Sequence, residues 1–577
     1  MSTGKRKPSI LNRKRKAGMI AWDIFPIAVT WLHVWLSPYT KVEESFTLHA
    51  VHDMLAHGLW PSSIARWDHV TFPGAVPRSF LPSIILASLS YPVVQAGSLL
   101  GLFHTKLDIQ IIIRIVLASG FAVSFAQLTK ALRYRYGPGV RIWFILLSLT
   151  QFHVPYYAGR TLPNFMALPG VYLAVGWIIR SGASSIPAPI RRKRVRMTIA
   201  LLTFLATNTR LELALFLLPM TLGLVINGMT TIPDAILAGA AGGFSALAVS
   251  GPIDYFLWSQ ALPHPSLPTF NSAWQIIWPE LSSMHYNLVQ GQSANWGIMS
   301  KHYYFSNSLP KLLMGALPLA ALGAVLVPAS RLGIARKSIG LGQVKAIQEV
   351  TGRLGMGLGV VGLLGGLSAV GHKEWRFVVY AVPVVNVVAA MTASALWSTT
   401  PPRIRPLFRL GLIGLLALQV VATGFLTFIS ANNYPGGDVW RALEELRVPT
   451  ASGEPVTVHF SSYPLQTGAS LFTFLHDTTF PTTQYTSALS SATNQPEWIY
   501  SKSEDPALLT PSGARKAGID YVVLESGTER PWVEGIGARW ETVKEIQGLK
   551  GVKRGGKYGV RVEWDRRVVI LGRRDIV

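Results

Sequence analysis

Two adjacent carboxylates, Glu43 and Glu44, stand in the segment SPYTKVEESFTLHAVHD, which directly follows an apolar run. An ionisable group held at the edge of hydrocarbon is costly and usually has a purpose. Carboxylates also serve as general bases where a hydroxyl must be deprotonated. On an irregular loop one of the two can act on a substrate while the other positions it. The plain alternative is a pair of solvated loop charges neutralised by Lys41.

The same segment contains His49, His52 and Asp53, which raise the question of a metal site. The two histidines are three residues apart, and neither a second histidine pair nor the order H-E-x-x-H accompanies them. The chain contains no cysteine, which removes thiolate catalysis, cysteine-ligated zinc and disulfides. We therefore expect no metal and no cofactor.

A second cluster of ionisable residues, GHKEWRFVVY at 371–380, lies between two apolar runs. His372, Lys373 and Arg376 offer three cationic or donor groups, and charge-assisted bonds from such groups hold phosphate strongly. Arg376 is the first choice, because its planar guanidinium can bind two phosphate oxygens at once. The cluster indicates either an anion site at the membrane edge or a cytosolic loop whose charges only set topology.

Two further patterns favour structural roles. The glycines of GLGVVGLLGG at 357–366 lie inside an apolar run with no Lys-Ser or Lys-Thr after them, so close helix packing explains them better than a nucleotide loop. Arg210 and Glu212 also lie in an apolar stretch, where they can neutralise each other.

These residues must be positioned by a membrane-embedded scaffold. Of the 577 residues, 49% are hydrophobic and only 14% are charged, against about a quarter charged in soluble domains. Long, nearly uncharged runs recur, several of them close to the roughly 20 apolar residues that a spanning helix needs. The runs at 197–250 and 355–395 are long enough for two passes each. We predict an α-helical polytopic membrane protein with about eleven spans.

Charge sets the expected topology. The N-terminal tail, 1–19, contains KRKPSILNRKRK and no acidic residue, so the positive-inside rule keeps it cytosolic and puts the first loop on the opposite side. The net charge of +24 is thus explained without nucleic acid. No small-residue cleavage site follows the first span, which predicts a retained signal anchor. The basic run Arg191–Arg196 should also be cytosolic, yet four apparent spans separate it from the first loop, so one of them must be split, re-entrant or misread.

Two long loops interrupt the expected transmembrane domain, 20–430. In the first, 38–79, HAVHDMLAHGLW predicts a short amphipathic helix along the membrane surface. The second, 252–311, is rich in Trp, Tyr, Asn, Gln and His, which suits sugar binding or an interfacial aromatic belt. After 430, strand-like alternation predicts a soluble α/β-like domain over 431–577.

Several motifs occur in order along the chain: PYTKVEESF followed by HD, DHVTFPGAVPRSF, RTLPN, SANWG, HKEWRF and NYPGG. Together they resemble glycosyltransferase family 22, the dolichyl-phosphate-mannose-dependent mannosyltransferases with the GT-C fold, and in particular its α-1,6-transferring branch. The resemblance extends over roughly 20–480. It departs from the family pattern at Thr47, Leu48 and His49, where relatives commonly have Asn and Gln, and at Thr71, where they have an acidic residue.

The resemblance implies an inverting transfer of mannose from dolichyl-phosphate-mannose to the lipid-linked oligosaccharide Man7GlcNAc2-PP-dolichol. The new linkage would be α-1,6, and it would add the eighth mannose for protein N-glycosylation. The resemblance also implies a multi-pass protein among the lipids of the endoplasmic reticulum membrane, with a luminal active site and a luminal C-terminal domain. Because the donor carries a single phosphate, one base and a stabilised leaving group suffice, without a metal.

The resemblance assigns the base to Glu43 or Glu44, and we favour Glu43 with Glu44 orienting. It assigns the donor phosphate to Arg376, His372 and Lys373. Acceptor- or sugar-binding residues are expected within the matching motifs. They are Asp53, His52, Asp68, Arg78, Arg160, Asn295, Trp296 and Tyr303.

Two other functions stay open. An α-1,2-mannosyltransferase of the same family is the nearest rival, although the KVEES and HKE wording argues against it. A lipid or sugar transporter would suit the intramembrane charges and the glycine-rich run, but it predicts inverted repeats, which the sequence does not show.

Overall fold

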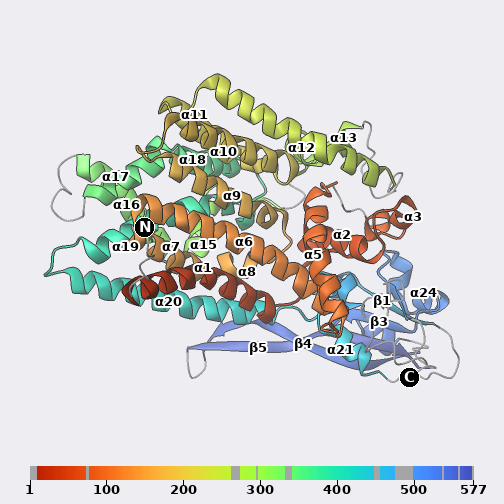
Figure 1. Ribbon diagram of the computed structural model, residues 1–577. Helices are drawn as coiled ribbons and strands as arrows, with labels where there is room; N and C mark the ends of the chain where they lie inside the picture. The colour runs from red at the N-terminus through yellow and green to blue at the C-terminus, as the bar shows by residue number, and fades with distance from the viewer. Residues whose placement is uncertain are drawn as a thin grey trace, which may run out of the picture.

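The computed structural model describes residues 10–72, 74, 77–260, 273–293, 297–331, 341–446, 455–474, 498–535, 539–555 and 559–574. Most of it is a bundle of long helices, and a small domain built on a sheet lies at one end and one side of that bundle (Figure 1). The long helices are α1 (Ile10–Leu36), α5 (Leu81–Leu99), α6 (Lys106–Tyr136), α7 (Pro138–Leu149), α9 (Pro163–Ser181), α10 (Ala188–Asn208), α11 (Ala214–Ile226), α12 (Ile232–Gln260), α16 (Ala316–Arg331), α18 (Met356–Ala369), α19 (Val382–Ser398) and α20 (Arg405–Ala431).

Short helices form the loops between them. They are α2 (Ser45–Ala56), α3 (Pro61–Ile64), α4 (Asp68–Thr71), α8 (His153–Tyr157), α13 (Trp274–Ile277), α14 (Pro279–Met284), α15 (Leu309–Leu313) and α17 (Leu341–Gln348). The second loop begins later than its composition predicted, because α12 continues through Pro252 to Gln260.

Four described helices are long and apolar enough to cross a membrane: α6, α12, the helix Trp375–Ser398 that contains α19, and α20. Two bent pairs, one broken by 110° before Ala316 and one by 55° before Met356, raise the number to six if each pair is one span. Three shorter apolar helices add to this membrane-protein architecture. The expected count of about eleven is not reached by length and composition, because turns break several apolar runs into shorter helices.

Helix α5 lies against the first loop. Its Leu86, Ala87 and Val94 belong to the same buried cluster as Leu48 and Val51 of α2. Between the first loop and α10, α6 is the one described helix that is long and apolar enough to cross a membrane by itself, and α7 is a shorter apolar helix. Neither α5 nor α9 reaches that hydropathy in the described chain.

Helix α2 differs from the expected surface helix, since every residue from Thr47 to Ala56 is buried. Its histidines have carboxylate partners inside the protein: His49 pairs with Asp68, and His52 pairs with Asp53. An amphipathic pattern here marks a polar cluster in the interior and not a face turned to the membrane surface.

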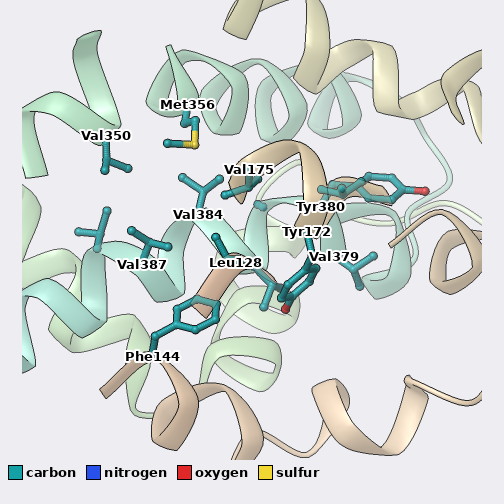
Figure 2. Packing of buried hydrophobic residues seen from close by; sticks show 14 of the residues in the cluster. Leu128, Phe144, Tyr172, Val175, Val350, Met356, Val379, Tyr380, Val384 and Val387 are labelled. Carbon is teal, nitrogen blue, oxygen red and sulfur yellow. The ribbon is translucent and has the colours of Figure 1, made fainter. Parts of the chain in front are cut away.

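The core of the bundle is formed where α6, α7, α9 and α19 meet. Figure 2 shows Leu128, Phe144, Val175 and Val387 pointing toward one another from these helices. Close approach depends on small residues elsewhere in the bundle. A Cβ added at Gly362 of α18 would lie 2.3 Å from Pro219 Cγ of α11, which confirms that the glycine-rich run serves helix packing.

The C-terminal domain contains one five-stranded sheet in the order β2-β1-β3-β5-β4. Strand β1 pairs in parallel with β2 and β3, and strand β5 pairs antiparallel with β3 and β4. The α/β character predicted from the three alternating segments is therefore correct. The elements are α21 (Val439–Glu444), β1 (Val456–Phe460), α22 (Ser462–Gln466), β2 (Trp498–Ser501), α24 (Pro511–Lys516), β3 (Tyr521–Glu525), α25 (Arg530–Val533), β4 (Trp540–Arg554) and β5 (Val560–Arg573).

Candidate active site

The two adjacent glutamates point in different directions from a single 3-10 turn, Val42–Glu44, that leads into α2. Glu44 is only 1% exposed, and its Oε1 accepts hydrogen bonds from Arg160 Nη1 at 2.7 Å and from the Lys41 backbone N–H at 3.1 Å. A buried carboxylate with a guanidinium partner is an anchor for the loop, because either charge alone would be costly there.

Arg160 is the centre of a buried network at the base of the first loop. Besides the carboxylate, it donates to the Tyr39 backbone oxygen, the Ser37 hydroxyl and the Tyr156 hydroxyl at 3.0, 2.8 and 2.7 Å. Its guanidinium also lies 4.5 Å from the ring centroid of Tyr156 and 5.2 Å from that of Tyr434. The sequence assigned Arg160 to sugar binding, but its contacts are those of a residue that supports the loop.

Glu43, by contrast, is exposed and lines a cavity of about 380 Å³. No cation of the described residues lies within ion-pair distance of its carboxylate, whereas Glu44 Oε1 is held by Arg160 and its buried Oε2 has no hydrogen-bond partner among the described residues. A free carboxylate at a cavity wall has the freedom to accept a proton from a bound hydroxyl. Glu43 and Glu44 therefore differ in burial and contacts: Glu43 lines the cavity, and Glu44 is held by Arg160.

The cavity lies between the first loop and the C-terminal domain. Three carboxylates and several aromatic rings face it. Carboxylates can accept hydrogen bonds from sugar hydroxyls, and aromatic rings can pack against the apolar C–H face of a sugar. Its walls come from Val42, Glu43, Ser45, Phe46, His49, Asp68, His69, Phe72, Gly74, Arg78, Leu465, Ala469, Ser470, Leu471, Phe474, Lys502 and Glu504.

Asp68 is held at the cavity wall from two sides. His49 Nδ1 lies 3.0 Å from Asp68 Oδ2, and Lys502 Nζ contacts Asp68 Oδ1. Burial alone would raise the pKa of Asp68, but Lys502 and His49 outweigh it and hold the pKa well below its usual range. Asp68 therefore faces the cavity as a carboxylate, where it can accept hydrogen bonds from hydroxyl groups.

His52 and Asp53 lie behind Asp68 and do not line the cavity. Asp53 Oδ2 accepts a hydrogen bond from the Asp68 backbone N–H at 2.7 Å, and Asp53 Oδ1 lies 2.9 Å from His52 Nδ1. Burial raises the pKa of Asp53 well above its usual value and lowers that of His52. Both residues were expected at the sugar, but their contacts support the start of α4.

A cluster of arginines adjoins the cavity. Arg78 lines both the cavity and a narrow neighbouring space that also includes Glu280. Burial, together with the nearby guanidiniums of Arg210 and Arg376, lowers the pKa of Arg78 to about 10. Arg210 Nε lies 2.9 Å from Glu212 Oε1, which confirms the neutralising pair expected from the sequence. Arg210 and Arg376 do not line the cavity, and each is paired with a carboxylate, so Arg78 is the guanidinium of the three that faces it. A guanidinium in this position is suited to a phosphate group.

Of the other two predicted cations of HKEWRF, His372 shares the Glu374 carboxylate with Arg376, whereas Lys373 is placed elsewhere. Arg376 Nη2 lies 2.6 Å from Glu374 Oε2, and His372 Nε2 lies 3.1 Å from Glu374 Oε1. Lys373 is only 2% exposed, and its ammonium donates to the backbone oxygens of Val370 and, at 3.4 Å, of Met299. It caps the end of α18 through these backbone contacts.

The remaining predicted residues are placed differently. Tyr303 packs against the main core beside Tyr304, with 5.8 Å between ring centroids, and it does not line the cavity. Asn295 and Trp296 lie outside the described residues. Within the described ranges, no group of three or more His, Asp or Glu side chains is arranged to hold a metal ion.

Sequence reasoning missed Lys502, Glu504 and Glu280. Lys502 and Glu504 belong to no motif and come from the C-terminal domain, so only the packing of that domain brings them to the cavity. Glu280 lies in the second loop, whose aromatic and amide residues gave no signal for a buried carboxylate. Its carboxylate accepts a hydrogen bond from the Leu211 backbone N–H at 3.2 Å.

Solved structures with a similar fold identify the class of protein. The chain matches the crystal structure of ArnT from Cupriavidus metallidurans bound to undecaprenyl phosphate with a TM-score of 0.54, at 11% identity, over 96% of this chain and 98% of ArnT. The apo state of the same protein matches with a TM-score of 0.52, at 14% identity, over 97% and 99%. The fold is that of a GT-C membrane glycosyltransferase, as the sequence predicted.

The sequence places the chain within that class. The model of the Alg9-like mannosyltransferase family matches residues 21–472, and the chain belongs to this family.

Three relatives share one name, Dol-P-Man:Man(7)GlcNAc(2)-PP-Dol alpha-1,6-mannosyltransferase. The Drosophila melanogaster protein is 30% identical over 84% of this chain and 60% of its own length. The Saccharomyces cerevisiae protein is 29% identical over 78% and 77%, and the Arabidopsis thaliana protein is 26% identical over 78% and 80%. The chain thus spans about three fifths of the Drosophila relative's length.

Proposed function

We propose that this chain is an inverting α-1,6-mannosyltransferase that moves mannose from dolichyl-phosphate-mannose to Man7GlcNAc2-PP-dolichol. The observation that carries the proposal is the free carboxylate of Glu43 in a cavity that adjoins an arginine cluster, with Arg78 lining both. A base on one side of a reacting sugar and cations on the other are what a single displacement needs. The relatives' names supply the substrates, since the geometry alone does not select them.

In this reaction Glu43 removes the proton from the acceptor 6-hydroxyl as its oxygen attacks C1 of the donor mannose. The bond between C1 and the phosphate oxygen breaks, and its electron pair leaves with dolichyl phosphate. Arg376 and Arg78 stabilise the charge that grows on this phosphate, an effect that is large in a site shielded from water. Attack opposite the leaving group converts the β-linked donor into an α-linked product.

The supporting residues fix this geometry. Arg160 and Glu44 hold the turn from which Glu43 projects, and the 2.7 Å contact between them leaves little freedom to that turn. Asp68 offers a hydrogen-bond acceptor to the sugars of the acceptor. In this proposal 38–79 is the catalytic loop, 20–430 the transmembrane domain, and 431–577 a luminal domain of an enzyme in the endoplasmic reticulum membrane.

The test is linkage analysis of the product made by the purified protein from the two lipid substrates. A single new α-1,6-linked mannose on Man7GlcNAc2-PP-dolichol is the expected result. A new α-1,2 linkage would refute this specificity and favour the sister activity of the family. Movement of lipid across vesicles without any new glycosidic bond would refute the enzymatic proposal altogether.

A further inference from the structure

The C-terminal domain reaches into the cavity through Lys502, which lies beyond the family match at 21–472. Its ammonium contacts Asp68 Oδ1 and lies 4.3 Å from the ring centroid of Phe72. The Lys502 side chain is only 14% exposed and that of Asp68 only 10%. This ion pair is therefore largely withdrawn from water, unlike exposed pairs whose net contribution is small.

Buried hydrogen bonds attach the C-terminal domain to helix α6 of the bundle. Lys502 directly follows strand β2, which pairs in parallel with β1. On the bundle side, Lys106 Nζ donates to the Phe474 backbone oxygen at 2.8 Å, and the Ser470 hydroxyl donates to Gln110 Oε1 at 2.9 Å. Both contacts are buried. Lys502 is thus presented to Asp68 by an anchored scaffold and not by a free tail.

The cavity is open to solvent beside the C-terminal domain. Glu504 of that domain lines it and is exposed, as are Val42 and Glu43 of the first loop. A branched oligosaccharide is far larger than one mannose, so it needs such an open side to reach the cavity.

We infer that the C-terminal domain completes the acceptor subsite: Lys502 is a positioning residue that orients Asp68, and Glu504 beside it contacts hydroxyl groups of the acceptor glycan. Carboxylates are acceptor-only groups, and sugar hydroxyls are the donors that they can satisfy. Without Lys502, Asp68 keeps His49 as its one side-chain partner among the described residues and can turn away from the cavity. The inference rests on the proposed function for the identity of the acceptor.

The experiment uses the full-length protein in detergent with both purified lipid substrates. Lys502→Met should raise the acceptor KM, and the acceptor Kd measured without donor, by about tenfold or more, as expected for a lost charge-assisted contact. The donor KM should change by less than about twofold. Lys502→Arg should restore acceptor binding, because arginine keeps a positive charge beside the Asp68 carboxylate. Lys516→Met, at an exposed lysine of α24 in the same domain, is the matched control.

Two further variants separate positioning from a general loss of folding. Glu504→Gln changes an exposed side chain and should also raise the acceptor Kd without lowering the thermal midpoint. Asp68→Asn combined with Lys502→Met should be no worse than Asp68→Asn alone, because the two residues act through one contact. Unchanged acceptor Kd values in Lys502→Met and Glu504→Gln, alongside normal wild-type turnover, would overturn the inference and leave the proposed function intact. Absence of transfer by the wild-type protein would overturn the proposed function instead.

Discussion

Replacing each of the two adjacent glutamates by glutamine should produce two different defects. Glu43→Gln removes a carboxylate that lines the cavity without any ion-pair partner among the described residues. General-base loss lowers rates by about 10² to 10⁴, so we expect turnover to fall at least a hundredfold. Its folded structure should be unaffected, because no buried contact is lost. Thermal unfolding of the variant should match that of the wild type.

Glu44→Gln should instead lower stability. The buried Arg160 guanidinium would lose its counter-ion at 2.7 Å and stay 1% exposed. Breaking a buried ion pair from one side costs about 3 to 5 kcal/mol. Because glutamine keeps an acceptor oxygen and Arg160 keeps three other acceptors, we expect a loss near the low end, about 3 kcal/mol. Turnover of the protein that stays folded should fall less than in Glu43→Gln.

Both properties are measurable on the same preparations. Intrinsic tryptophan fluorescence during heating gives the unfolding midpoint, and mannose transfer between the purified lipids gives turnover per folded molecule. The double variant Glu44→Gln with Arg160→Met should recover part of the lost stability, because the charge of Arg160 no longer stays buried without its counter-ion. If Glu44→Gln lost turnover but no stability while Glu43→Gln kept normal turnover, the base would be Glu44 and the division of roles would be wrong.

Four other predictions concern separate parts of the molecule. Arg376→Ala should raise the donor KM by about tenfold or more with little change in acceptor binding, whereas Lys373→Ala should lower the unfolding midpoint and leave the donor KM near normal. Burial lowers the pKa of His69 to about 4, so stability that is complete above about pH 6.5 should fall by up to about 3 kcal/mol toward pH 4 as the unfolded state takes up the proton, and His69→Phe should flatten that part of a midpoint-against-pH curve. Gly362→Ala should cost about 1 to 3 kcal/mol by overpacking against Pro219, while Gly365→Ala, where an added Cβ meets nothing within 4 Å, should be neutral or stabilising in the same unfolding assay. Chelator treatment should leave transfer unchanged, because the donor carries one phosphate that the arginines can neutralise, and a strict need for added Mg²⁺ or Mn²⁺ would contradict this.

The parts predictable from sequence are those that local patterns determine. Strand alternation identified the C-terminal sheet, and the spacing of Arg210 and Glu212 predicted their ion pair. The divergence of Glu43 and Glu44 was not predictable in the same way, because it depends on which carboxylate meets Arg160 from a distant loop. Lys502 was invisible for a similar reason, since its place follows from how an entire domain packs.

Composition also has a limit in membrane proteins. The run that contains α5 is long and nearly uncharged, yet α5 falls short of the hydropathy of a spanning helix and packs along α2. Burial in protein and burial in lipid favour the same residue types, so hydropathy alone cannot tell them apart. In α2 the polar pattern was misleading in the opposite sense, because His49 pairs with Asp68 of α4 and His52 with Asp53 in the interior.

The contact between the first loop and the segment after α20 has a consequence for the order of biosynthesis. Lys41 Nζ donates to the Asn433 backbone oxygen at 2.7 Å across 392 residues of sequence, and Tyr39 donates to Asp438 at 2.9 Å. At roughly 5 to 20 residues per second, the ribosome needs about 20 to 80 s to reach Asn433 after it has made Lys41. During that interval the nascent loop waits without its C-terminal partners. Translation pausing, or chaperones that shield the loop in the compartment where it emerges, should therefore control how much active protein a cell obtains.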